Sequence, residues 1–263
     1  MIAPHLPQGL TLVIQNELTS KPYVEMTLAM LAEAGIQHQW NSNKISIAKQ
    51  AFKKAELTIE PDWSAASYWY SLVALSDDGD VFLSNLKKES LQGDSAIVEI
   101  MSGFGVQTLF TDGGLWLKKT SVFKPQKHYN LKECPDLAQT VIVCSAALGY
   151  DAEFSGLETL RIKETDRILA LQNELAKIGV KLIEDGANYR LDCSGGHFPQ
   201  QASFPTYEDH RMAMALAPLA MFIPEVQFDD EKVVGKSYPN FWKDLESVGF
   251  KVEGEGLKVE SEG

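Results

Sequence analysis

The densest cluster of charged side chains in the sequence is the run Lys163-Glu164-Thr165-Asp166-Arg167. Lys163 and Arg167 are four residues apart, so they share one face if the run forms a helical turn. Beside two cations, Glu164 is held ionised or is poised to transfer a proton. The run therefore predicts an anion-binding site with an acid–base residue in it. The alternative is a solvated charge cluster that only marks the start of a helix.

Two further stretches place charge at the start of an apolar helix. Asp209-His210-Arg211 precedes an apolar run over residues 212–224, and a guanidinium there matches the oxygens of a carboxylate or phosphate. We expect His210 to support packing rather than catalysis. Asp136 opens another predicted helix. It either contacts a ligand or serves only as an N-cap, whose carboxylate accepts the free N–H groups of the first turn.

The elements that position these residues repeat along the chain. Four segments consist of an amphipathic helix, a glycine and an apolar residue that opens a strand. Their glycines are Gly35, Gly105, Gly179 and Gly249, at steps of 70, 74 and 70 residues. Glycine suits the position after a helix, where the backbone needs a positive φ. The repeats therefore predict four structural units of similar design.

A second helix is predicted 43, 43 and 40 residues before the last three glycines, starting near Asp62, Asp136 and Asp209. Aspartate is a favoured N-cap, and a strand signal follows each of these helices. The order strand–helix–strand–helix–strand–strand predicts an α/β (α+β) fold of repeated βαβαββ units with mixed sheets.

The first unit is incomplete, because its opening helix would fall before residue 1. We therefore expect a piece of a longer repeat array. Residues 1–60 would be the truncated last unit of an N-terminal domain, and residues 61–263 a C-terminal domain of three units. The predicted boundary is Glu60-Pro61, where the second unit begins.

The loops that lead into the second helices cover residues 18–23, 89–94, 160–167 and 234–240, and three of them contain lysine. Equivalent loops of repeated units are expected on related faces. A helix N-terminus offers unpaired N–H groups and the positive end of a dipole, so a nearby cation completes an anion site. We therefore expect a small, multiply anionic ligand.

The composition excludes several classes of protein. A formal net charge of −12, from 24 basic and 36 acidic residues, argues against a nucleic-acid partner. Cys134, Cys144 and Cys193 have no C-x-x-C spacing, which favours reduced thiols in a cytoplasmic protein over a disulfide framework or a zinc site. The first residues are not typical of a signal peptide, and residues 212–224 are too few for a membrane span of about 20 residues.

The sequence also lacks the common cofactor motifs. No G-x-x-x-x-G-K-[ST], G-x-G-x-x-G, G-x-S-x-G or H-E-x-x-H run occurs, and the five histidines are scattered. We therefore expect catalysis without a metal or a bound cofactor.

Seven stretches resemble the 5-enolpyruvylshikimate-3-phosphate synthase family, also called 3-phosphoshikimate 1-carboxyvinyltransferase. They are SKPY (20–23), EPDWSAASY (60–68), QGD (92–94), PDLAQT (135–140), LRIKETDR (160–167), EDHRMAMA (208–215) and GKSYPNFW (235–242). They span nearly the whole chain in the family's order. The resemblance implies an enolpyruvyl transferase-type fold and transfer of the enolpyruvyl group from phosphoenolpyruvate to the 5-hydroxyl of shikimate 3-phosphate, without a cofactor.

The resemblance also implies roles for single residues. Asp136 matches an aspartate at the shikimate hydroxyls, a candidate for proton transfer. Lys163 matches a lysine that bridges both substrates, and Glu164 a glutamate implicated in protonating the enolpyruvyl carbon. The cations implied to bind phosphoenolpyruvate are Arg167, Arg211 and Lys236. The implied shikimate 3-phosphate positions are Ser20, Tyr23 and Thr159, the last standing where some family members carry an asparagine ligand.

The phosphate-binding motifs of the family's N-terminal region are absent from this sequence. The resemblance therefore implies half of an active site, a chain that is inactive alone, and the missing N-terminal domain as its partner. Two alternatives stay open. One is the sister enzyme that transfers enolpyruvyl to a UDP-amino sugar, and the other is a non-catalytic module of the same fold that binds a partner.

Overall fold

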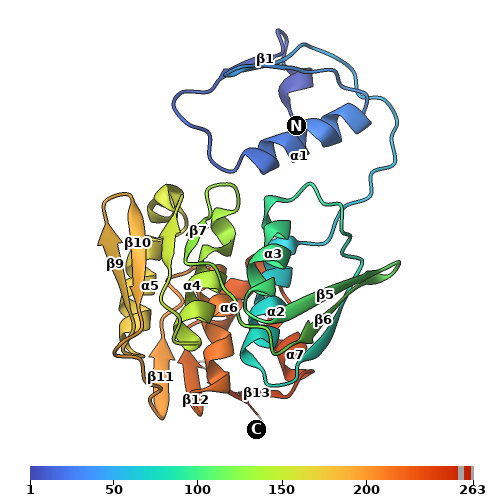
Figure 1. The fold of residues 1–263 in the computed structure, drawn as a ribbon. Coiled ribbons are helices and arrows are strands. Elements are labelled where there is room, and N and C mark those ends of the chain that lie inside the picture. Colours follow the sequence, from blue (N-terminus) through green and yellow to red (C-terminus); the bar gives the residue numbers. More distant parts are fainter. Residues whose placement is uncertain (254–257, 262–263) are drawn as a thin grey trace.

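The computed structural model describes residues 1–253 and 258–261. A small N-terminal layer of one helix and three strands lies above a larger body that holds the rest of the chain (Figure 1). Residues 48–62, which form neither helix nor strand, link the two. The buried apolar side chains form two separate clusters, one within residues 3–47 and one within residues 63–250.

The N-terminal layer is an antiparallel sheet with one helix on it. Its elements are η1 (Ala3–His5), β1 (Leu10–Val13), α1 (Lys21–Glu33), β2 (Gln39–Asn41) and β3 (Lys44–Ile47). The strands pair in the order β1-β3-β2. Leu28 and Leu31 of α1 share a small core with Ile45 and Ile47 of β3, so the helix is held to one face of the sheet.

The second unit has the predicted order of helix, strand, helix, strand and strand. Its elements are α2 (Trp63–Leu75), β4 (Asp80–Ser84), η2 (Gly93–Ala96), α3 (Ile97–Ser102), β5 (Val106–Thr111) and β6 (Gly114–Lys119). The strands form an antiparallel sheet in the order β4-β6-β5. Within the described part of the chain, no opening strand pairs with this sheet, so one long edge of β4 is unpaired.

The third and fourth units show the whole βαβαββ pattern, which confirms the predicted fold class. The third consists of β7 (His128–Asn130), η3 (Pro135–Leu137), α4 (Ala138–Ala147), β8 (Glu153–Ser155), η4 (Glu158–Ile162), α5 (Arg167–Ala176), β9 (Lys181–Asp185) and β10 (Asn188–Asp192). The fourth consists of β11 (Gln201–Phe204), α6 (His210–Leu216), η5 (Ala217–Met221), β12 (Glu225–Phe228), η6 (Glu231–Lys236), α7 (Phe241–Glu246), β13 (Phe250–Glu253) and β14 (Lys258–Ser261).

Both sheets are mixed, as predicted. They run in the orders β7-β8-β10-β9 and β11-β12-β14-β13. In each, the first two strands are parallel because a helix crosses between them, and the others are antiparallel.

The repeated glycines have the predicted backbone conformation. Gly35, Gly105, Gly179 and Gly249 have φ of +78°, +84°, +72° and +95°. Each follows the second helix of its unit, where the chain must turn sharply into the next strand. A residue with a Cβ is strained in this region of φ, so the repeat seen in the sequence has a direct conformational cause.

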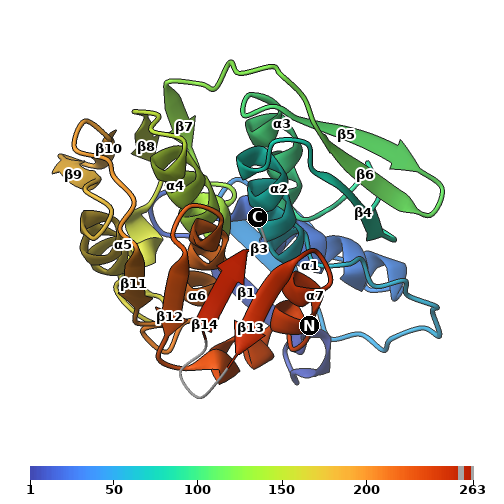
Figure 2. The ribbon, with the colours of Figure 1, turned by 90° about the horizontal axis from the view of Figure 1, so that it is seen from below.

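The first helices of the three later units form the shared core. In Figure 2, α2, α4 and α6 lie in the middle and the sheets surround them, and α4 contacts both α2 and α6. Every residue of α4 is buried. A helix that is apolar on most of its surface is stabilised by burial on all sides, which explains why these helices lie inside and the sheets outside.

Two N-caps were predicted correctly and one was not. Asp62 and Asp209 accept the N–H groups of Ser64 and Arg211 at the starts of α2 and α6. Asp136 does not cap α4. Pro135 opens a 3-10 turn instead, Leu137 takes the N-cap position without a side-chain bond, and the Asp136 carboxylate is free for other contacts.

Among the described helices, none has the length and apolar character that crossing a membrane requires. The three cysteines are free thiols.

Candidate active site

Six of the residues singled out in the sequence meet in one network of ion pairs, which we call the ionic network. Its members are Asp136, Lys163, Glu164, Arg167, Arg211 and Lys236. They come from η3, the loop before α5, the start of α5, the start of α6 and the end of η6. The network therefore lies where the third and fourth units meet.

Arg167 is the centre of the network, with a side chain only 1% exposed. Its Nε donates to Asp209 Oδ2 at 2.7 Å, and its Nη2 to Asp209 Oδ1 at 3.3 Å. Its Nη1 donates to Asp136 Oδ1 at 3.0 Å, and Nη2 also to Glu164 Oε2 at 2.8 Å. A buried guanidinium is tolerable only with such partners, because burial removes its hydration. Arg167 thus fixes the positions of three carboxylates.

The helix cap of α5 sets Arg167 in this place. Asp166 accepts the N–H of Leu169 at 3.0 Å, so the helix starts at Arg167 and directs that side chain inward. The predicted helical turn from Lys163 to Arg167 is wrong, because Lys163 follows η4 and lies outside a helix. The two cations still meet, because both contact Asp136. The alternative of a solvated charge cluster is wrong for Arg167.

Asp136 contacts three cations at once. Lys163 Nζ lies 3.3 Å from Oδ1, and Arg211 Nη2 lies 3.2 Å from Oδ2, in addition to Arg167. Burial raises the pKa of Asp136, but Arg211, Lys163 and Arg167 together outweigh burial and hold this pKa below its ordinary value. Asp136 is therefore an ionised carboxylate whose charge is balanced by three cations.

Glu164 joins the centre of the network to its exposed edge. It bonds to Arg167 and to Lys236, whose side chain is 55% exposed. Burial acts to raise the pKa of Glu164, but the Lys236 ammonium, a backbone N–H and Arg167 lower it to about 2. Without a ligand, Glu164 therefore carries no proton to donate. It can gain a proton only if Lys236 and Arg167 bind another anion instead.

Asp209 is a network partner that the sequence reasoning missed, because it was interpreted only as an N-cap. It is fully buried, and one oxygen accepts both the Arg211 N–H at 2.9 Å and Arg167. The neighbouring His210 is 4% exposed, and its Nδ1 has no hydrogen-bond partner within the described residues. Burial and the Arg211 charge lower the pKa of His210. The histidine is therefore neutral, as a packing role requires.

The three residues implied to bind shikimate 3-phosphate do not share one set of contacts. Tyr23 lies on α1 with a buried hydroxyl that interacts electrostatically with Asp94, Asp136 and Arg211. Ser20 precedes α1, and its backbone N–H donates to Lys132 O at 3.0 Å. The Thr159 hydroxyl is buried in η4 without a partner. In the part of the chain that the structure describes, neither Ser20 nor Thr159 bonds to the ionic network.

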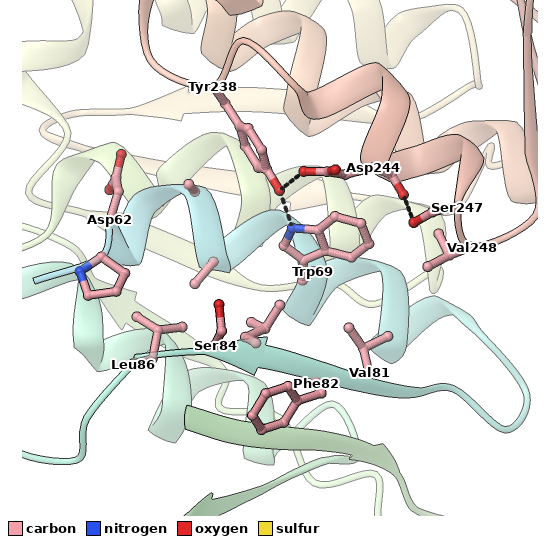
Figure 3. Close-up of a pocket in the computed structure, with 14 residues that line it drawn as sticks. Asp62, Trp69, Val81, Phe82, Ser84, Leu86, Tyr238, Asp244, Ser247 and Val248 are labelled. Atoms are coloured by element: carbon pink, nitrogen blue, oxygen red, sulfur yellow. Dashed lines mark hydrogen bonds between the residues drawn. The ribbon is translucent and has the colours of Figure 1, made fainter. Parts of the chain in front are cut away.

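A separate pocket of about 380 Å³ lies between α2, β4 and α7. Figure 3 shows Trp69 and Tyr238 over it, where the indole N–H donates to the Tyr238 hydroxyl at 3.2 Å and this hydroxyl donates to Asp244 at 2.9 Å. No member of the ionic network lines this pocket. It lacks the cations that a polyanion needs, so the candidate active site is the network and not this pocket.

The described residues hold no cluster of three or more histidines, cysteines or carboxylates arranged for a metal ion. The chemistry open to the network itself is electrostatic binding of anions beside an ionised aspartate and an ionised glutamate.

Known proteins resemble this chain over most of its length. The family model for EPSP synthase (3-phosphoshikimate 1-carboxyvinyltransferase) matches residues 1–245. A 3-phosphoshikimate 1-carboxyvinyltransferase of Bacteroides fragilis is 42% identical over 265 residues, which cover 100% of this chain and 63% of the relative. That of Syntrophobacter fumaroxidans is 32% identical over 252 residues, or 94% of this chain and 58% of the relative. The chain thus spans less than two thirds of the length of these relatives.

Solved structures share the fold. An EPSP synthase of Acinetobacter baumannii superposes with a TM-score of 0.65 at 18% identity, over 88% of this chain and 54% of that one. The enolpyruvyl transferase NikO of Streptomyces tendae gives 0.60 at 13% identity, over 95% and 56%. The resemblance carried by the sequence motifs is confirmed by the match over residues 1–245, and the chain belongs to the EPSP synthase (3-phosphoshikimate 1-carboxyvinyltransferase) family.

Proposed function

We propose that this chain supplies one wall of an active site that transfers the enolpyruvyl group of phosphoenolpyruvate to the 5-hydroxyl of shikimate 3-phosphate and releases phosphate. The observation that carries the proposal is the convergence of four cations from two units around two ionised carboxylates. Both substrates are small polyanions, and preorganised cations stabilise the charge that develops on them during reaction.

The cations differ in how easily a ligand reaches them. The side chains of Lys236 and Lys163 are 55% and 29% exposed, and that of Arg211 is 14% exposed. Arg167 is already bonded to three carboxylates. A direct contact between Arg167 and phosphoenolpyruvate therefore requires Glu164 or Asp136 to move aside. We expect Lys236 and Lys163 to meet the substrate first.

The reaction proceeds by addition and then elimination. The 5-hydroxyl oxygen bonds to C2 of phosphoenolpyruvate, C3 gains a proton to become a methyl group, and a tetrahedral intermediate forms. The methyl group then returns a proton while the bond to the phosphate oxygen breaks. We propose Asp136, which its three cations hold in the ionised form, as the acceptor of the hydroxyl proton.

Glu164 is the proposed donor of the proton to C3, which requires that it first gains one. When substrate anions draw Lys236 and Arg167 away, the pKa of Glu164 rises from about 2, because its lowering depends on those cations. Substrate binding then leads Glu164 to take up a proton. In the ligand-free protein these carboxylates act as internal counter-ions, and they keep the four cations in place.

We further propose that residues 1–60 are the last part of an N-terminal domain and that residues 61–263 form a C-terminal domain. The two separate apolar clusters and the irregular link between them support this division. The share of the relatives' length that the chain covers supports a missing N-terminal domain as its partner. We place the protein in the cytoplasm, where its three free thiols stay reduced.

Calorimetry tests the choice of substrate. We expect shikimate 3-phosphate to bind to the chain, UDP-N-acetylglucosamine to give no heat, and Lys163→Met to weaken the binding. The matched control is Lys181→Met, on the exposed start of β9. Heat with the UDP-sugar instead would favour the sister enzyme, and equal loss in both variants would contradict a role for the ionic network.

A further inference from the structure

A fully buried carboxyl lies beside the ionic network without an ion-pair partner of its own. Asp94, in η2, is 0% exposed. Its Oδ2 accepts a hydrogen bond from the Ser64 hydroxyl of α2. Its Oδ1 has no hydrogen-bond partner, and no lysine or arginine among the described residues forms an ion pair with it. In this respect Asp94 differs from Asp136, which contacts three cations.

A second buried oxygen without a partner faces it from the N-terminal layer. The Tyr23 hydroxyl of α1 is buried and unbonded, and Tyr23 and Asp94 interact electrostatically with each other. Helix α1 packs against η2. Gly93 permits this approach, because a Cβ there would lie 3.2 Å from Pro22 and 2.5 Å from Glu133 O. Tyr23 and Asp94 therefore lie together where the two cores meet.

An ionised Asp94 fits this environment poorly. An unpaired charge without water is costly in a protein interior, and the group normally becomes neutral instead. The groups around Asp94 are Tyr23 of α1, Ser64 of α2, Cys134 and Asp136 at η3, and Arg211 of α6. Burial raises the pKa of Asp94, and Asp136 acts in the same direction, while Ser64, Tyr23 and Arg211 oppose them.

A proton on Oδ1 allows Asp94 to donate to Tyr23 Oη while its Oδ2 still accepts from Ser64, so both lone oxygens gain a partner without a buried charge. The Tyr23 proton then turns away from Asp94, and the other charged groups that interact electrostatically with this hydroxyl are Asp136 and Arg211. Each buried polar group left without a partner costs about 1–3 kcal/mol, so this arrangement removes two such losses with one hydrogen bond.

We propose that Asp94 is a positioning residue that stays protonated at neutral pH and, by donating to Tyr23, turns the Tyr23 hydroxyl toward the substrate anion. The direction toward substrate rests on the proposed function, whereas the proton on Asp94 does not. A neutral Asp94 adds a hydrogen-bond donor to the site through Tyr23. An ionised one would add a negative charge that repels both polyanionic substrates.

Infrared difference spectroscopy on the 263-residue chain at neutral pH tests this. The carbonyl stretch of a protonated carboxyl lies well above the bands of ionised carboxylates. We expect this band in the wild type and its loss in Asp94→Asn, which keeps the shape of the neutral acid. Asp230→Asn, which changes an exposed helix-cap carboxylate, is the control and should leave the band in place. A wild type without the band would overturn the proposal.

Tyr23→Phe tests the pairing and keeps the proposal falsifiable if Asp94→Asn does not fold. Removal of the phenol oxygen should shift the Asp94 band to higher frequency, and an unmoved band would overturn the contact. Since both readouts need no substrate, they are independent of the proposed reaction. If shikimate 3-phosphate binds, Tyr23→Phe should weaken it about threefold to tenfold, the range for one hydrogen bond, and Asp94→Asn should leave it within about twofold.

Discussion

Replacement of Arg167 by methionine should destabilise the protein strongly. Methionine keeps most of the apolar stem but removes the guanidinium, which makes four hydrogen bonds to three carboxylates and is 1% exposed. Asp209, which is fully buried, then loses its cation. Removal of one partner from a buried ion pair costs about 3–5 kcal/mol, because the remaining charge is uncompensated.

Arg161 offers a matched control. It also bonds to two carboxylates, Asp166 and Glu184, but its side chain is 36% exposed. Arg161→Met should lower the free energy of unfolding by less than about 1 kcal/mol, since water screens exposed ion pairs. Salt should abolish this small effect and leave the large effect of Arg167→Met in place, because a buried pair is screened much less.

Urea unfolding followed by circular dichroism measures both variants. The double variant Arg167→Met/Asp209→Asn should recover part of the stability lost in Arg167→Met, because it removes the stranded charge. Asparagine also keeps the N-cap of α6. A loss below about 1 kcal/mol for Arg167→Met, similar to that expected of an exposed pair, would refute the claim that this guanidinium holds the network together.

Lys236→Ala should raise the pKa of Glu164 from about 2 toward its ordinary 4.5, as followed by carboxyl ¹³C chemical shifts; an unchanged pKa would remove Lys236 as a cause. The folded-state pKa of Glu164 lies below 4.5, so Glu164 stabilises the protein above pH 4.5 and loses this contribution as the pH falls toward about 2. The stability of Lys236→Ala should therefore depend less on pH between these two values. Gly179→Ala should destabilise more than Gly249→Ala in thermal unfolding. Both glycines have a positive φ, of +72° and +95°, but a Cβ at Gly179 would lie 2.0 Å from Gly195 O, whereas a Cβ at Gly249 has no atom of the described residues within 4 Å; equal losses would contradict this. The chain alone should release no phosphate from the two substrates in a steady-state assay, and normal turnover would contradict the half-site.

Local signals made the fold predictable. The glycines after the second helices and the aspartate caps of α2 and α6 depend on a few neighbouring residues, so their meaning is visible in the sequence. The same logic failed at Asp136, since Pro135 favours a 3-10 turn whose geometry turns the carboxylate away from the helix. A cap signal does not reveal whether a tertiary partner competes for the same side chain.

The ion pairs of the site were less predictable than the fold, because they join segments that are far apart in the sequence. Arg167 meets Asp209 over 42 residues and Arg211 meets Asp136 over 75. The motif resemblance placed Arg167 and Arg211 in one site but gave no sign that Asp209 would share it. Asp94 lay in a matched motif, yet its burial without a paired cation emerged only from the packing of α1 on η2.

The central claim is that the ionic network binds substrate anions and that Glu164 takes up a proton when they bind. The carboxyl ¹³C shifts of Glu164 and Asp136, measured with shikimate 3-phosphate and phosphoenolpyruvate present together, test it most directly. We expect both signals to move and the pKa of Glu164 to rise above about 2. Saturating ligands that leave both signals and this pKa unchanged would contradict the account.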